Sequence, residues 1–311
     1  MRSIHARARR PWPLAVVCVL LLVLAACGSA ENAALDAEDS ASTSEPTDEP
    51  TDEPTDEPTT ETTTPPTTAA PTTPAPPAAP TVGQCRNLNA LDVRARIATL
   101  TTAPIACSTS HNAQTYKVGT LTNAISSAIS GGNRVTIFAA ARRTCELDLP
   151  AYLGVDDERQ KQSQFDFVIS VPTSSEVAAG AKWVRCDVVL KNGQTKAEPL
   201  PGANAKNALR GSKGNPYLQC IRSSNINQAS GTFLCRDAHN WRSVTAIKLG
   251  VGSKPWPGTS ELTSSVRGRC STAVRRYLDT SGSFQYGYIL PTQDLWKYGD
   301  RWAVCFAKTR K

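Results

Sequence analysis

The spacing of eight cysteines constrains the fold of this chain more than any other feature of its sequence. The eight fall into two sets of four: Cys85, Cys107, Cys145 and Cys186, followed by Cys220, Cys235, Cys270 and Cys305. In an oxidising compartment, four cysteines are most simply two disulfides. They allow three pairings, between which the sequence alone does not choose. Short loops favour first with second and third with fourth, and each bond typically contributes about 2–4 kcal/mol.

The residues after the second cysteine of each set indicate that the two sets are copies of one pattern. Both copies read C-x-x-x-H-N, with His111 in the first and His239 in the second. A stretch of alternating apolar and polar residues comes next, at 115–121 and 243–249. A period of two is typical of a half-buried strand, so each copy is predicted to place a strand here.

The third cysteine of each set lies in a helical pattern. Apolar residues recur at every fourth position, with the same offsets in both copies: Ile137, Ala141, Cys145, Leu149 and Leu153, then Leu262, Val266, Cys270, Val274 and Leu278. This spacing puts each cysteine on the buried face of an amphipathic helix. We expect Pro150 to shorten the first helix, because proline disrupts a helix interior.

The longest repeated string is P-T-x6-G-x2-W-x2-C, which ends each copy at Cys186 and Cys305. It predicts a strand, a loop turned by glycine, and a closing strand. Together these patterns predict an α+β fold of two small disulfide-stapled domains. Each is expected to hold a small, mostly antiparallel sheet with one amphipathic helix. We place the domains at 82–192 and 216–309, with a linker at 193–215.

The order of these motifs resembles a known family. Gly83-Gln84-Cys85, the C-x-x-x-H corner, the cysteine within a helix and the final Gly299-Asp300-Arg301-Trp302 string are similar to the septum formation family of actinobacterial envelope proteins. The resemblance covers both copies and rests mostly on the cysteine framework. The chain departs from the pattern at Gln114 and Arg242, where an acidic residue is expected. The resemblance implies envelope or division biology, and it implies no reaction.

Residues 1–26 have the features of a secretory signal. Arginines precede an apolar run of 13 residues at 14–26, which is shorter than the roughly 20 residues that span a bilayer. The run ends in Leu24-Ala25-Ala26-Cys27, which resembles a bacterial lipobox. The hypothesis is a lipoprotein, acylated on Cys27 with palmitate among the expected chains, at the outer face of the cell membrane. The alternative is an ordinary cleaved signal with Cys27 incidental, and Cys18 leaves with the signal.

Residues 27–81 are predicted to form a disordered stalk. Glu-Pro-Thr-Asp tetrads and a Thr/Pro/Ala tract contain too little apolar surface to offset the entropy of ordering. Residues 31–80 carry 12 acidic and no basic side chains, which leaves 15 acidic and 30 basic residues in 81–311. The basic part is expected to meet anionic lipid, wall polymer, an acidic partner or this stalk. The alternative is that its charge only keeps the protein soluble.

The sequence contains none of the common catalytic motifs: no G-x-S-x-G elbow, no S-x-x-K, no C-x-x-C and no P-loop. A zinc module built on C-x-x-x-H is one alternative, but each copy has a single histidine and zinc needs three or four converging ligands. An envelope hydrolase using His111 or His239 is a second alternative, but a histidine repeated beside a cysteine is more typical of a structural corner. We therefore expect no enzyme activity, no metal and no cofactor.

Five side chains outside the framework are candidates for binding. Trp241, Trp256 and Trp296 are additional aromatics of the second copy, while Arg142 and Arg267 are equivalent positions three residues before the helix cysteine. Exposed aromatics and arginines often anchor partners, although tryptophan also fills small cores. The leading hypothesis is a non-catalytic binding or scaffold protein of the cell envelope, linked to septum formation. Its partner would be an envelope protein or an anionic wall polymer, and not nucleic acid.

Overall fold

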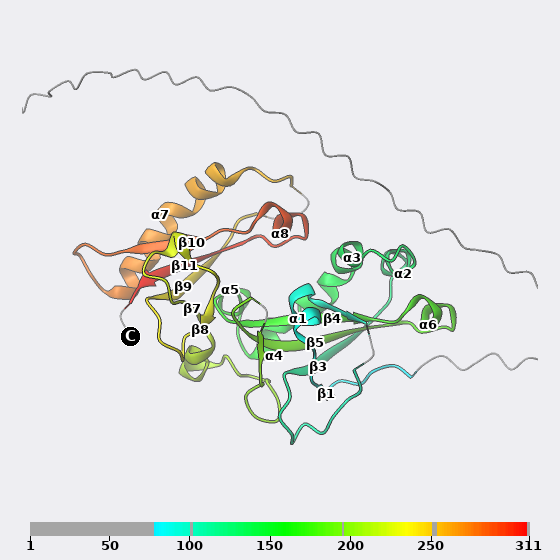
Figure 1. Ribbon diagram of the computed structural model, residues 1–311. Helices are drawn as coiled ribbons and strands as arrows, with labels where there is room; N and C mark the ends of the chain where they lie inside the picture. Colours follow the sequence, from blue (N-terminus) through cyan, green and yellow to red (C-terminus); the bar gives the residue numbers. More distant parts are fainter. Residues whose placement is uncertain (1–77, 100–101, 195, 251–253, 310–311) are drawn as a thin grey trace, which may run out of the picture. The chain divides into compact units, whose positions relative to one another are not determined.

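The computed structural model describes residues 78–309, except 100–101, 195 and 251–253. The predicted signal, Cys27 and nearly all of the predicted stalk lie outside these residues. The described residues belong to one compact unit, Thr68–Lys311, and their strands form two sheets (Figure 1). No helix in this part of the chain is long and apolar enough to cross a membrane.

The first sheet contains the first set of cysteines. Its strands are β1 (Cys85–Arg86), β2 (Ile97–Thr99), β3 (Ala113–Thr120), β4 (Phe165–Val171), β5 (Trp183–Asn192) and β6 (Lys196–Glu198). The order is β1-β3-β5-β4-β2, with β6 paired to β5. The pairs are antiparallel except β2 with β4, which is parallel. The predicted strand after His111 is β3.

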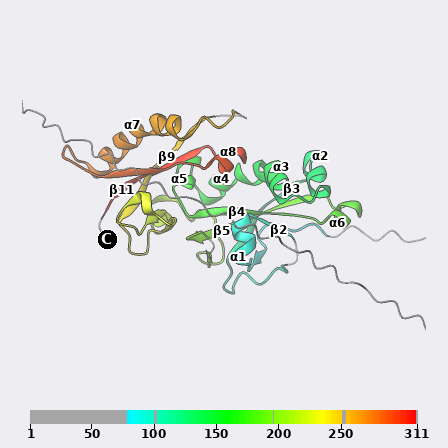
Figure 2. The same ribbon diagram turned by 45° about the horizontal axis from the view of Figure 1, so that its top comes forward.

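Helices cover both faces of this sheet. They are α1 (Ala90–Ala95), α2 (Asn123–Ser130), α3 (Arg134–Glu146), α4 (Leu149–Leu153), α5 (Asp157–Lys161) and α6 (Ser174–Ala178). Figure 2 shows α3 and α1 on opposite faces of β4 and β5. The helix α3 ends at Glu146, and α4 begins with Pro150 in its first turn. The helix that carries Cys145 thus ends before Pro150, as predicted, and the separate short helix α4 was not predicted.

The second sheet contains the second set of cysteines. Its strands are β7 (Gln219–Ile221), β8 (Phe233–Leu234), β9 (Trp241–Lys248), β10 (Tyr286–Ile289) and β11 (Trp302–Lys308). They are antiparallel in the order β10-β11-β9-β7-β8. The remaining elements are α7 (Thr259–Leu278), α8 (Gln293–Lys297) and the 3₁₀ turns η1 (Gly211–Tyr217) and η2 (Ile226–Gln228). The helix α7 lies along β10 and β11 (Figure 1).

The described residues contain four disulfides, which join Cys85 to Cys107, Cys145 to Cys186, Cys220 to Cys235, and Cys270 to Cys305. The pairing of first with second and third with fourth, which loop length favoured, is therefore confirmed. One disulfide in each half joins the long helix to the closing strand: α3 to β5, and α7 to β11. Cys145 and Cys270 are fully buried, on the apolar helix face that the fourfold spacing predicted. The predicted α+β fold class is confirmed.

The repeated P-T-x6-G string differs from the predicted loop, because a short helix lies inside it in both halves. Thr173 and Thr292 cap α6 and α8 by accepting a hydrogen bond from a backbone N–H three residues on. Gly180 and Gly299 follow these helices with φ of 98° and 85°, a conformation that side-chain-bearing residues rarely adopt. The threonine cap and the glycine stop therefore define a helix of five residues rather than an irregular loop.

The segment assigned to the linker, 193–215, packs against the first sheet. It contributes β6 and places three buried side chains in the first core: Leu200, Ala205 and Leu209. Hydrogen bonds then join the halves, because the carbonyl of Gln162 accepts from Gln219 N at 2.7 Å and from Ser243 Oγ at 3.0 Å. These contacts bring α3 and α5 of the first half close to β9 and the α8–β11 segment of the second.

Candidate anion-binding site

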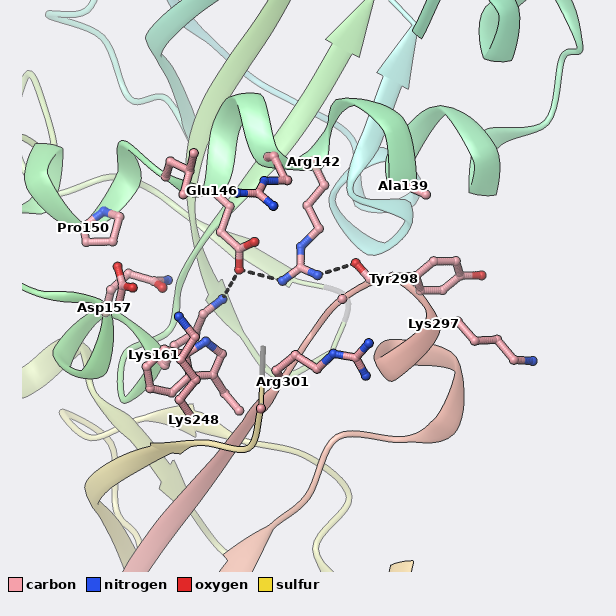
Figure 3. A pocket seen from close by; sticks show the side chains of 16 residues that line it. Ala139, Arg142, Glu146, Pro150, Asp157, Lys161, Lys248, Lys297, Tyr298 and Arg301 are labelled. Atoms are coloured by element: carbon pink, nitrogen blue, oxygen red, sulfur yellow. Dashed lines mark hydrogen bonds and ion pairs between the residues drawn. The ribbon is translucent and has the colours of Figure 1, made fainter. Parts of the chain in front are cut away.

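A cavity of about 570 Å³ lies between α3 and α5 on one side and the ends of β9, α8 and β11 on the other. Figure 3 shows the side chains that line it. Among these described residues six are basic and two are acidic: Arg142, Arg143, Lys161, Lys248, Lys297 and Arg301, against Glu146 and Asp157. A concave surface with this excess of one charge concentrates ligands of the opposite charge. The cavity is therefore suited to an anion.

Arg142 holds the two sides of the cavity together. It projects from α3, and its side chain is only 4% exposed. Its Nη2 is 2.6 Å from Glu146 Oε1, one helical turn further along α3. Its Nη1 donates to the carbonyl oxygen of Tyr298, at the end of α8 (Figure 3). One guanidinium thus links residues that are 156 positions apart in the sequence.

Gly299 makes room for this contact. The backbone N–H groups of Gly299 and Asp300 bond back to Trp296 and Leu295 at 2.9 Å, the Schellman pattern that ends a helix. A Cβ on Gly299 would lie 2.7 Å from Arg142 Nη1. The guanidinium therefore reaches the negative end of α8 because residue 299 has no side chain.

Glu146 neutralises part of the positive charge in the cavity. Its Oε1 is 3.0 Å from Lys161 Nζ as well as bonded to Arg142. Burial alone would raise the pKa of Glu146, but the charges of Lys161 and Arg142 outweigh burial and lower it. The carboxylate is therefore ionised at neutral pH, and it balances only one of the two cations that it contacts.

Arg301 adds a second buried guanidinium, with 9% of its surface exposed. Its Cζ lies 3.8 Å from the centroid of the Trp296 ring, a cation–π contact, and its Nη2 donates to Lys254 O at 3.1 Å. Burial and the charge of Arg142 both lower the pKa of Arg301, while Asp300 opposes them. The two arginines repel each other across the cavity, and an anion between them would relieve that repulsion.

The structure separates the candidate binding residues. Arg142 lines the cavity, and Trp296, 4% exposed, supports Arg301 from behind. Trp256 packs edge-on against Trp296, with ring centroids 5.5 Å apart. These three candidates belong to the cavity or its supporting wall.

Trp241 and Arg267 lie elsewhere. Trp241 is 5% exposed in the core of the second sheet, and its Nε1 donates to Ser223 O at 3.0 Å. Arg267 is exposed on α7 and is absent from the described residues that line the cavity. Arg142 and Arg267 therefore occupy equivalent positions in the sequence but lie in different environments.

The sequence did not predict most of the basic residues that line the cavity, which are Arg143, Lys161, Lys248, Lys297 and Arg301. Lysines and arginines at helix ends and strand ends have no local signature, because they meet only when the two halves pack. One signal was present: the second copy reads Gly299-Asp300-Arg301 where the first reads Gly180-Ala181-Lys182. That difference marks the arginine that lines the cavity.

The two histidines form matching corners away from this cavity. His111 Nδ1 donates to Thr109 O and His239 Nδ1 donates to Asp237 O, both at 2.8 Å, and both rings are buried. Their neighbours Cys107 and Cys235 are in disulfides and so cannot act as thiolate ligands. In the part of the chain that the structure describes, no three His, Cys, Asp or Glu residues are grouped to hold a metal ion.

A comparison with known protein families identifies the family of this chain. The family model described as septum formation matches residues 82–283. The chain belongs to the septum formation family. Membership supports a role in septum formation. The match begins in the first half and ends in the second. That the two halves are tandem copies of one domain stays a prediction. No curated protein and no solved structure matches the chain.

Proposed function

We propose that this septum formation protein is a membrane-anchored lipoprotein outside the cytoplasm that binds an anionic polymer of the cell envelope. The observation that carries the proposal is the cavity with six basic side chains against two carboxylates. Both of its buried arginines are fixed by neighbouring groups, so the site is formed before a ligand arrives. Preformed sites bind more tightly, because less conformational freedom is lost on binding.

The charge distribution along the chain supports an anionic partner. Residues 81–311 carry 30 basic and 15 acidic side chains. The lipobox-like Cys27 would hold this basic part at the outer face of the membrane, where anionic wall polymers are within reach. As a scaffold, the protein would join the membrane, through a lipid on Cys27, to a polymer bound in the cavity that residues 139–302 form.

The proposal assigns no catalytic step to the protein. His111 and His239 donate Nδ1–H to backbone carbonyls within their own corners, which supports a structural role. Neither histidine is among the described residues that line the cavity. Replacing both with glutamine should leave polymer binding unchanged, and turnover of wall substrates by the wild-type chain would overturn the non-catalytic assignment.

The test is binding of the full mature chain, in detergent micelles, to poly(glycerol phosphate). Arg143→Gln, Lys248→Gln and Lys297→Gln remove exposed cavity charges, and each should weaken binding about fivefold, from about 1 kcal/mol per contact in water. Arg267→Gln and Lys206→Gln are matched controls, because each removes one exposed charge elsewhere. Equal losses in cavity and control variants would contradict the proposal.

Salt provides a second readout. The six basic and two acidic side chains leave four net positive charges in the cavity. If four phosphates replace counterions there, the affinity should fall about 50-fold between about 50 and 200 mM salt. A salt-independent affinity would exclude this electrostatic mode of binding.

A further inference from the structure

A second, smaller cavity of about 150 Å³ adjoins the first. Gln160 and Lys161 of α5 line both cavities. The second one extends toward the first sheet, where Gln164 precedes β4 and Lys191 lies on β5. Lys161 is therefore the basic residue that the two cavities share.

Two buried donors in the wall of the second cavity have no acceptor in the described part of the chain. They are Gln164 Nε2 and Arg96 Nε. Gln164 is 5% exposed. Buried polar groups are normally paired, so donors of this kind mark a place where an acceptor oxygen fits.

The charged groups of this cavity also suit an anion. Arg96, Lys161 and Lys191 supply three cations and exceed the carboxylates of the wall by one. Arg96 and Lys191 pair with Asp166 at 2.6 and 3.6 Å, and Lys161 pairs with Glu146 at 3.0 Å. Asp300 is the other carboxylate in the wall. Donors that come from several elements can bond the non-bridging oxygens of a phosphodiester, the anion that repeats along the polymer proposed for the first cavity.

We infer that the second cavity binds a further phosphodiester group of the same linear polymer that occupies the first cavity. The inference rests on the proposed function and deepens it, because it names the ligand as a repeating phosphodiester chain. Lys161 lies between the two subsites and contacts both of the bound groups. Linking two weak sites through one ligand raises its affinity well above that for a single group.

The test compares glycerol 3-phosphate with glycerol phosphate oligomers of increasing length, using calorimetry on the full mature chain. Wild-type affinity should rise at least about tenfold once the oligomer carries enough phosphates to reach both cavities. Gln164→Leu and Lys191→Gln should reduce this gain to less than about threefold while leaving the affinity for glycerol 3-phosphate unchanged. Asp300→Asn removes a repelling carboxylate and should raise oligomer affinity about threefold, a gain that misfolding cannot produce.

The outcomes separate the inference from the proposed function. If Lys248→Gln weakens oligomer binding but Gln164→Leu and Lys191→Gln do not, the second subsite is refuted and the first cavity stands. If no phosphate compound binds the wild-type chain, both are refuted. If an acidic peptide of residues 45–61 shows the same length-dependent gain and the oligomers do not, the phosphodiester assignment is refuted.

Discussion

Replacing Gly299 with alanine tests the geometry on which the cavity depends. An alanine with φ near 85° costs about 1–2 kcal/mol in backbone strain. Its Cβ would also lie 2.7 Å from Arg142 Nη1 and displace the guanidinium from Tyr298 O. Loss of a buried hydrogen bond from a charged group costs about 1.5–3 kcal/mol more. We therefore expect Gly299→Ala to lower the free energy of unfolding by about 2.5–5 kcal/mol.

Gly132→Ala is the matched control, because Gly132 follows α2 with φ of 65° and a Cβ there would meet nothing within 4 Å. It should cost only the strain of about 1–2 kcal/mol. Urea unfolding with the disulfides intact measures both variants. In an Arg142→Met background the excess cost of Gly299→Ala should disappear, which a double-mutant cycle detects. Equal costs for the two glycines, or an excess that persists in the Arg142→Met background, would refute this account of Gly299.

Three further predictions concern charge, covalent bonds and the anchor. The pKa of Glu146 is lower in the folded chain than its ordinary value of 4.5. Its ion pairs therefore stabilise the fold fully above pH 4.5, and this stabilisation is lost as the pH falls through the pKa of the folded chain. Glu146→Gln should thus lower the melting temperature at about pH 7, and the difference from wild type should shrink as the pH falls below 4.5. A constant difference would contradict this. Replacing Cys270 and Cys305 with alanine opens a loop with a sequence separation of 35 and should cost about 4 kcal/mol in urea unfolding; a cost under about 1 kcal/mol would contradict it. Cys27→Ser should move the protein from the membrane fraction to the soluble fraction while Cys18→Ser does not, and membrane retention of Cys27→Ser would refute the anchor.

The cysteine framework was the most predictable part of this fold. Loop length favoured the observed pairing, and fourfold spacing put Cys145 and Cys270 on buried helix faces. Both signals are local, because each depends on residues within one half. The helices α6 and α8 were missed even though their signal was also local. Thr173 and Glu176 form a capping box, which marks a helix start more strongly than the glycine marks a loop.

The cavity was not predictable for a different reason. Arg142 was selected because it matches Arg267 in helical register, yet Arg142 is buried against Tyr298 and Arg267 is exposed. The repeated sequence pattern assigns equivalent positions to the two halves. A site between the halves takes different residues from each half, so equivalent positions need not share a role. The partners Lys161 and Lys248 meet only after the halves pack, and no local pattern marks them.

Lysine footprinting tests the central claim most directly, because it reports where a polymer binds. The full mature chain is acetylated with and without poly(glycerol phosphate), and each lysine is quantified by mass spectrometry. Lys248 and Lys297 line the cavity, while Lys206 and Lys213 are also exposed but lie outside it. We predict strong protection of Lys248 and Lys297 and none of Lys206 and Lys213. Equal protection of all four lysines, or protection of the second pair alone, would contradict binding in the cavity.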